Sequence, residues 1–252
     1  MALIKTIVSF VITGFAALGF IPGGILFFIV SLFGLRKPMA FLIYKMIQAW
    51  ARVIIVLTGC SMTVTGRENI PKKGGLCFVS NHVGIFDIIL ALAYAGRPFG
   101  FVAKKELIFV PGINIWIYLL GGLFIDRGHP RKALKTINLG IKRIKAGAAM
   151  LIFPEGTRSR GRGIGPFHPG SLKLASQSEA PIVPMAITGS YDVFEKNYRV
   201  HSGPVSISFL PPVNPAELPP ADRKILLADK LHDNIAKVLE THAPSGVSNP
   251  AI

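Results

Sequence analysis

Two residues whose types suit acid–base chemistry lie five positions apart in SNHVGIFDIIL, residues 80–90: His82 and Asp87. A carboxylate that accepts one imidazole N–H fixes the tautomer of the ring and leaves the other nitrogen free to take a proton. In one continuous helix, a step of five residues turns by about 140°, so the side chains can meet only if His82 precedes the helix. Gly84 permits a loop at that point, and Asp87 is a suitable N-cap for the helix that follows. The alternative for an isolated pair of this spacing is an N-capping aspartate beside an unrelated histidine.

Two further loops carry residues that suit an anionic ligand. FIDRGHP brings Asp126 and Arg127 to the end of a predicted strand, and residues 153–170 contain five glycines and three arginines. Guanidinium groups donate paired hydrogen bonds to phosphate, and glycine lets the main chain approach it closely. Between residues 104 and 173, 13 lysines and arginines face three acids, which also favours an anionic ligand. The G-x-x-x-x-G-K-[ST] pattern is absent, so nucleotide hydrolysis is not indicated.

Other chemistries lack their motifs in this chain. It contains neither G-x-S-x-G nor H-E-x-x-H, and no cysteine and histidine cluster has the spacing of a zinc site. Its two cysteines are too few for a disulfide framework. With no nucleophile of its own, the protein is expected to use His82 to activate a substrate hydroxyl, without a metal or another cofactor.

The elements that must position these loops follow from the apolar patterning. From about residue 62 onward, short β-rich runs alternate with helical patterns, which predicts an α/β fold with a mostly parallel sheet flanked by helices. The predicted strands are 76–80, 99–103, 122–126, 149–153, 182–187 and 204–210. The predicted helices are 87–95, 105–119, 130–146, 170–178 and 222–241. In such sheets ligands bind at the carboxyl ends of the strands, where the loops described above fall.

Residues 1–61 are predicted to attach the chain to a membrane. No charged residue occurs from Ile7 to Leu35, a run longer than the about 20 residues that span a bilayer. The apolar core of a cleaved signal peptide, roughly 7 to 15 residues, is too short to account for this run. Pro-Gly-Gly at 22–24 leaves open a kinked spanning helix or a hairpin of two short helices. Basic residues flank both ends of the run, which favours the hairpin.

Residues 38–58 form a second apolar segment, in which Lys45 and Arg52 lie nearly on one helical face. With Tyr44 and Trp50 nearby, the segment is expected to be an amphipathic helix whose aromatic and basic side chains occupy the headgroup layer. The alternative is a helix that packs on the core with two solvated charges. The formal net charge of +15 favours an anionic membrane as partner, because no nucleic-acid-binding motif is present.

Four blocks, NHVGIFD, GGLFIDR, FPEGTRSRGRG and IVPMAI, resemble in their order the motifs of the glycerolipid acyltransferases. The resemblance covers roughly residues 62–215 and is closest to the bacterial 1-acyl-sn-glycerol-3-phosphate (lysophosphatidic acid) acyltransferases. It implies an acyl-CoA or acyl-carrier-protein donor, a lysophosphatidate acceptor and phosphatidic acid as product. It also implies a cytoplasmic membrane location, with the catalytic domain facing the cytoplasm.

The resemblance assigns roles to eight positions of this sequence. His82 becomes the general base that deprotonates the acceptor hydroxyl, and Asp87 orients it. Phosphate-binding roles fall on Lys104, Arg127 and Arg158. Residues that shape the acceptor site are Glu155, Gly156 and Thr157.

Two departures from the family pattern leave the acceptor and donor preference open. Gly84 stands where relatives often have serine, and His168 and Pro169 stand where many have a lysine. The predicted organisation is a membrane-anchoring segment at 1–61, a catalytic domain at 62–242 and a disordered tail at 243–252. The remaining alternatives are another lyso-lipid acceptor, an acyl-thioester hydrolase and a non-catalytic membrane-binding protein.

Overall fold

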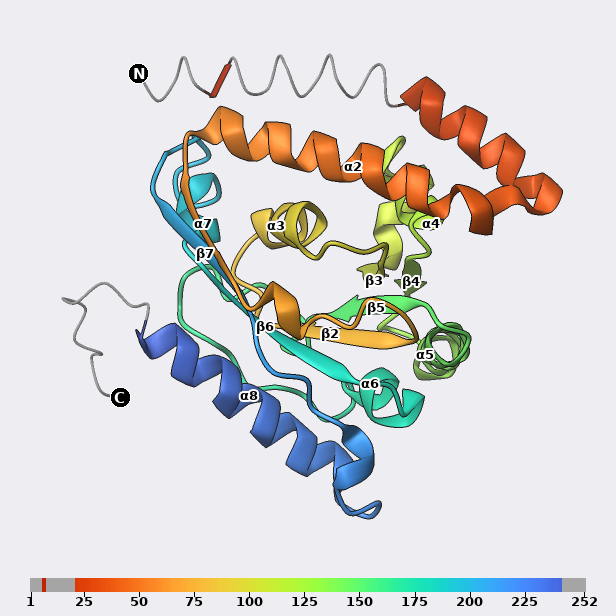
Figure 1. Cartoon of the computed structure of the whole chain (residues 1–252), viewed down its shortest axis with the longest axis vertical. Coiled ribbons are helices and arrows are strands. Elements are labelled where there is room, and N and C mark those ends of the chain that lie inside the picture. The colour runs from red at the N-terminus through yellow and green to blue at the C-terminus, as the bar shows by residue number, and fades with distance from the viewer. Residues whose placement is uncertain (1–5, 8–20, 242–252) are drawn as a thin grey trace.

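The computed structural model of the chain describes residues 6–7 and 21–241 (Figure 1). The predicted disordered tail lies outside the described residues, and so do residues 8–20 of the apolar run that begins at Ile7.

Seven strands form one sheet in the order β1-β7-β6-β2-β5-β3-β4. Among the described strands, all neighbours run parallel except β6 and β7, which are antiparallel. The strands are β1 (Ser61–Thr65), β2 (Leu76–Ser80), β3 (Gly100–Lys104), β4 (Leu123–Ile125), β5 (Ala149–Ile152), β6 (Ile182–Thr188) and β7 (Pro204–Phe209). The mostly parallel sheet confirms the predicted fold class, and the order places β2, β5, β3 and β4 side by side.

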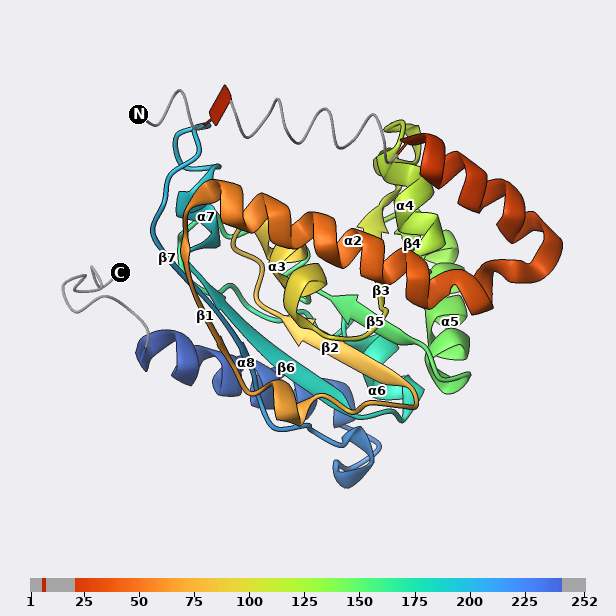
Figure 2. The ribbon, with the colours of Figure 1, turned by 45° about the horizontal axis from the view of Figure 1, so that its top comes forward.

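Helices cover both faces of this sheet (Figures 1 and 2). One face carries α2 (Arg36–Thr58), α3 (Phe86–Tyr94), α4 (Ile113–Leu119) and α7 (Ser190–Val193). The other face carries α5 (Pro130–Lys145), α6 (Lys173–Ser178) and α8 (Arg223–Thr241). Short helical turns lie at η1 (Ser31–Leu35), η2 (Arg67–Asn69), η3 (Lys105–Phe109) and η4 (Pro215–Glu217).

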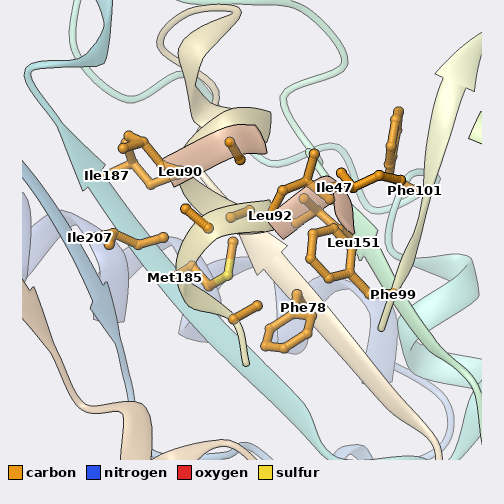
Figure 3. Close-up of a cluster of buried hydrophobic side chains, with 14 of the residues drawn as sticks. Ile47, Phe78, Leu90, Leu92, Phe99, Phe101, Leu151, Met185, Ile187 and Ile207 are labelled. Atoms are coloured by element: carbon orange, nitrogen blue, oxygen red, sulfur yellow. The ribbon is translucent and has the colours of Figure 1, made fainter. Parts of the chain in front are cut away.

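Strand β2 shows why the sheet needs helices on both faces. Its side chains alternate between two apolar clusters: Leu76 and Phe78 join one, and Cys77 and Val79 join the other. All four are fully buried, as expected for a central strand of a parallel sheet. In the first cluster Phe78 meets Phe99 edge to face, with ring centroids 5.7 Å apart (Figure 3).

The predicted strands and helices of the α/β region are all present, with three differences, one of which is the unpredicted four-residue helix α7. The edge strand β1 was missed, because its alternately exposed residues do not form an apolar run. The predicted helix 105–119 is interrupted between η3 and α4. Pro111 has no N–H to donate, and Gly112 adopts a φ of 81°, so neither residue continues a helix.

Among the described residues, a helix spans Ile21–Leu35 and is followed directly by α2. The Pro-Gly-Gly sequence lies within this helix. Within the described residues, the sharp bend occurs instead at Phe33 and Gly34, where Gly34 has a φ of 80°. The chain turns back into α2 at this point (Figures 1 and 2), and no pattern in the sequence predicted the bend.

Helix α2 corrects the expectation for residues 38–58. Tyr44 is fully buried and donates its hydroxyl to the Leu92 carbonyl, and Arg52 donates Nε to the Ala93 carbonyl. Gln48, also buried, donates to the same Ala93 carbonyl. These carbonyls end α3 and have no partner within that helix, so polar side chains of α2 satisfy them. The interpretation that placed Tyr44 in the headgroup layer was therefore wrong, whereas the side chain of Arg52 stays exposed while its Nε bonds to Ala93.

The opposite face of α2 remains apolar and exposed, at Phe41, Leu42, Val53 and Val56. Within the described residues, one helix, Met39–Thr58, is long and apolar enough to cross a membrane by length and composition, and a third of it is buried in the protein. Helix α2 thus combines a core-packing face with an exposed apolar face.

Candidate active site

A cavity of about 570 Å³ lies where β2, β3, β4 and β5 end. Six of the eight site residues predicted from the sequence line it: His82, Lys104, Arg127, Gly156, Thr157 and Arg158. Asp87 and Glu155 do not line the cavity and are both buried. The loops therefore meet at one edge of the sheet, as parallel neighbouring strands require.

The two side chains of the opening motif are in contact. Nδ1 of His82 lies 2.8 Å from Oδ2 of Asp87, whose side chain is completely buried. The same oxygen accepts the backbone N–H groups of Val83 and Gly84 at 2.7 and 3.0 Å. His82 precedes the helix, which resolves the geometric condition set by the five-residue spacing.

Asp87 does not cap α3 as predicted. The helix begins at Phe86, so Asp87 lies inside its first turn, and the N-cap position is Ile85. The carboxylate turns back to the loop amides that precede the helix rather than to the helix's own N–H groups. This orientation stabilises the loop in the shape that brings His82 to Asp87.

The second oxygen of Asp87 is held from another part of the chain. Ser190, the first residue of α7, donates its hydroxyl to Oδ1 at 2.5 Å. The carboxylate is therefore bound at both oxygens and cannot rotate without losing hydrogen bonds in a buried environment.

The imidazole of His82 is fixed by its surroundings as well as by Asp87. It stacks on Phe153, with ring centroids 3.9 Å apart and an interplanar angle of 18°. With Nδ1 directed at Asp87, Nε2 is the nitrogen left for a substrate in the cavity. Such a ring is oriented to accept a proton at Nε2.

Glu155 joins the histidine loop to the glycine-rich loop. Its Oε1 accepts the His82 backbone N–H at 2.7 Å, and its Oε2 accepts the Gly165 N–H at 3.1 Å. Burial raises the pKa of this carboxyl, although both hydrogen bonds oppose that shift. Glu155 thus holds the two loops together without lining the cavity itself.

The three basic residues have different partners. Lys104 lies 3.6 Å from Glu106, and both side chains are largely exposed. Arg127 donates from Nη1 to the carbonyl of Gly156, which adopts a φ of 72°. Arg158 pairs from Nη1 with Glu195 at 2.5 Å. The lining contains three cations against one acid, Glu106, which makes it suited to an anionic group.

Comparison with known proteins identifies the kind of enzyme that carries this arrangement. The family model described as Acyltransferase matches residues 61–188, half of the chain. The chain belongs to the acyltransferase family. The match confirms the family predicted from the four sequence blocks and makes the protein an enzyme of the acyltransferase class.

The acyltransferase resembles several curated and solved relatives. It is 32% identical over 199 residues to the 1-acyl-sn-glycerol-3-phosphate acyltransferase of Borreliella burgdorferi, covering 79% of each chain. It is 34% identical over 142 residues to the Escherichia coli protein of the same name, covering 56% of this chain and 58% of that one. The crystal structure of the 1-acyl-sn-glycerophosphate (LPA) acyltransferase PlsC from Thermotoga maritima superposes with a TM-score of 0.80 at 25% identity. That match covers 99% of this chain and 100% of the other.

A second, apolar cavity of about 370 Å³ adjoins the first one in the acyltransferase. It lies among α2, α3 and α4, and its lining includes Trp50, Leu92 and Trp116. Four residues line both cavities: Ile85, Ile88, Phe101 and Leu107. An apolar space therefore extends from beside His82 towards the N-terminal helices.

Sequence reasoning missed four residues that hold the site of the acyltransferase: Asn81, Phe153, Ser190 and Glu195. Asn81 was discoverable, since it precedes His82; it exchanges two 2.9 Å hydrogen bonds with the Ile187 backbone and extends the β2–β6 pairing. Ser190 lies 103 positions from Asp87, and Glu195 lies 110 positions from Ile85 and 37 from Arg158, so no local spacing points to them. Among the described residues, no three potential ligand side chains form a metal cluster.

Proposed function

We propose that this acyltransferase transfers an acyl group from acyl-CoA or acyl-carrier protein to the sn-2 hydroxyl of 1-acyl-sn-glycerol 3-phosphate, giving phosphatidic acid. The observation that carries the proposal is the contact of His82 with buried Asp87 at a cavity that also contains Arg127 and Arg158. The names of the curated relatives support the same acceptor.

The reaction needs one base and one site for two substrates. Nε2 of His82 takes the proton of the acceptor hydroxyl as its oxygen attacks the thioester carbonyl. The new C–O bond forms, the C–S bond breaks, and the thiolate leaves with the proton that His82 returns. Asp87 keeps the ring oriented and stabilises its charged form. Base catalysis contributes about 10²–10⁴-fold, and holding both substrates in one cavity contributes further.

The two cavities suit two different parts of the substrates, the phosphate of the acceptor and an acyl chain. Lys104, Arg127 and Arg158 are assigned to the phosphate monoester, because guanidinium and ammonium groups form charge-assisted hydrogen bonds with it. The adjoining apolar cavity is assigned to an acyl chain, since its lining excludes polar groups almost entirely. The reacting carbonyl would then lie beside His82, where the cavities meet.

The N-terminal segment is assigned to the membrane, as expected for an enzyme whose acceptor and product are lipids. Exposed apolar side chains gather on the helix Ile21–Leu35, on the outer face of α2 and around η3. The largest exposures among them are those of Phe33, Val56 and Phe109. Together with the net charge of +15, they favour attachment to an anionic bilayer, with residues 62–242 acting from its cytoplasmic side.

The test is a product analysis. Purified protein in detergent is offered a panel of lyso-lipids, each with acyl-CoA and with acyl-carrier protein, and products are identified by mass. Phosphatidic acid formed from 1-acyl-sn-glycerol 3-phosphate is the expected main product, and the variant His82→Ala should form it about 10²–10⁴-fold more slowly. Preferred acylation of another lyso-lipid would overturn the acceptor assignment. Release of free fatty acid without an acceptor would identify a hydrolase.

A further inference from the structure

Glu195 connects two parts of the site although it belongs to neither. It lies just after α7, and its side chain is 11% exposed. Its Oε2 accepts the Ile85 N–H at the start of α3, and its Oε1 pairs with Arg158, each at 2.5 Å. One carboxylate therefore bridges the histidine loop and the arginine of the glycine-rich loop.

Gly84 creates the space that this carboxylate occupies. A Cβ atom at position 84 would lie 2.6 Å from Oε2 of Glu195, closer than van der Waals contact permits. The backbone of Gly84 is outside the left-handed region, so its conformation does not by itself require glycine. The absence of a side chain at 84 is what lets Glu195 reach Ile85.

The anchoring of Glu195 determines what it can do for Arg158. A free arginine side chain samples many rotamers, and ordering it on ligand binding costs free energy. A carboxylate held by a backbone N–H removes much of that cost, because it fixes the guanidinium before the ligand arrives. Among the described residues, Arg158 uses Nη1 for this contact, and the guanidinium has five N–H donors, so others are left for a phosphate in the cavity.

We propose that Glu195 is a positioning residue of the acceptor site. From the space beside Gly84, its carboxylate orients Arg158 towards the phosphate of the acceptor. The proposal rests on the proposed function, in which Arg158 binds that phosphate. Glu195 contacts no reacting atom; it acts through Arg158.

The first test separates binding from chemistry in Glu195→Gln. The amide keeps the shape of the carboxylate but places an NH₂ group against one of its two donors. The KM for lysophosphatidate should rise by about five- to tenfold, as expected when a charge-assisted hydrogen bond is lost. The kcat and the KM for the acyl donor should change by less than about twofold, because Arg158 does not meet the reacting atoms.

Two matched variants guard this result. Asp192→Asn removes the same charge from the same segment, where Asp192 pairs with exposed Lys196, and should leave both KM values unchanged. Glu195→Asp keeps the charge and should recover part of the acceptor affinity. An acceptor KM for Glu195→Gln that is unchanged or lower would overturn the proposal, and so would an equal rise in both KM values.

Gly84→Ala tests whether Glu195 needs the space at position 84, without altering Glu195 itself. The added methyl group should displace the carboxylate and raise the acceptor KM in the same way. The double variant Gly84→Ala/Glu195→Gln should then show little more than the larger single effect, since both changes break one arrangement. Fully additive effects would show that Glu195 does not depend on the space at Gly84. If Glu195→Gln does not fold, as judged by its thermal unfolding, Gly84→Ala alone decides.

Arg158→Ala distinguishes a failure of the positioning role of Glu195 from a failure of the phosphate-binding role proposed for Arg158. If it leaves the acceptor KM unchanged, the phosphate assignment of Arg158 fails, and the role of Glu195 fails with it. If Arg158→Ala raises the KM and Glu195→Gln does not, only the positioning role is overturned. In both cases the formation of phosphatidic acid is scored separately by mass.

Discussion

Ser190 donates its hydroxyl proton to Oδ1 of Asp87, whereas His82 contacts Oδ2 of the same carboxylate. The two partners reach Asp87 from segments more than a hundred residues apart, and they meet at a side chain with no exposed surface. The orientation of the histidine is thus determined jointly by its own loop and by the segment that follows β6.

Replacement of Ser190 with Ala should lower kcat by about three- to tenfold and leave both KM values unchanged. The change removes one hydrogen bond to a buried carboxylate, which loosens Asp87 and the His82 ring without reaching the substrates. Steady-state kinetics of the purified variant check this. Ser190→Thr retains the hydroxyl and should recover most of the rate. Equal rates for Ser190→Ala and the wild type would show that Asp87 needs no support from α7.

Replacement of His82 with Ala should reduce acyl transfer by about 10²–10⁴-fold, the usual contribution of a general base. Equilibrium binding of lysophosphatidate should persist, because the phosphate contacts are intact. His232→Ala provides the control, since His232 lies on α8 and packs edge-on against Phe167; it should leave transfer unchanged. Substantial activity in His82→Ala would sink the proposed mechanism.

Replacement of Arg158 with Ala should raise the acceptor KM by about 10- to 100-fold, the effect of losing charge-assisted hydrogen bonds. Arg160→Ala is its matched control, because Arg160 lies two positions away, is exposed and does not line the cavity. The acceptor KM measured for both variants decides whether position 158 matters or the charge of the loop as a whole. Equal effects would favour the latter.

The raised pKa of Glu155 makes a prediction about stability and pH. As the pH rises above the ordinary value of 4.5, the unfolded chain loses this proton before the folded protein does. The folded state then binds more protons than the unfolded one, so the contribution of Glu155 to stability falls until the pH passes its raised value. Glu155→Gln lacks this dependence. The melting temperature of the wild type relative to Glu155→Gln should therefore increase between pH 7.5 and about pH 4.5.

The control for this series is Glu217→Gln, which changes an exposed carboxylate of η4. Its melting temperature should follow that of the wild type across the same pH range. A constant difference between Glu155→Gln and the wild type would mean that Glu155 titrates alike in the folded and unfolded chain.

Charged substitutions on the exposed apolar surface should weaken membrane binding. Phe33 and Phe109 are 79% and 82% exposed. The double variant Phe33→Asp/Phe109→Asp should lower partitioning to anionic vesicles by about tenfold or more, because two aromatic side chains no longer enter the bilayer. Ile225→Asp on α8, across the sheet from α2, should not change it (Figure 1). Vesicle co-sedimentation measures the difference, and equal partitioning of the two variants would argue against this surface.

Much of the fold and the convergence of the site loops could be predicted because parallel strands order their loops. Once the runs at 76–80 and 149–152 are recognised as strands, His82 and Arg158 must lie at the same edge of the sheet. The apolar runs are long enough to mark these strands without any tertiary information.

The parts that escaped prediction depend on contacts between distant segments. Helix α7 has only four residues and no periodic pattern, so nothing in the sequence places Ser190 on Asp87. Asp87 itself was read as an N-cap, because a helix start cannot be located to one residue from composition. Tyr44 and Arg52 of α2 were expected among lipid headgroups, since their partners, the last carbonyls of α3, are not apparent from the local sequence.

The hydrogen bonds from Gln48 and Arg52 to the end of α3 have a consequence for any attempt to make a water-soluble form of the enzyme. Six residues of α2 belong to the same core as Phe78 and Leu90: Ile43, Tyr44, Ile47, Ala51, Ile54 and Ile55. A water-soluble version made by cutting the chain before residue 62 would lose these six core residues. It would also expose α3, the helix that carries Asp87. Helix α2 therefore affects both solubility and catalysis. A detergent-free enzyme should be sought by changing the exposed outer face of α2 while its buried inner face is left intact.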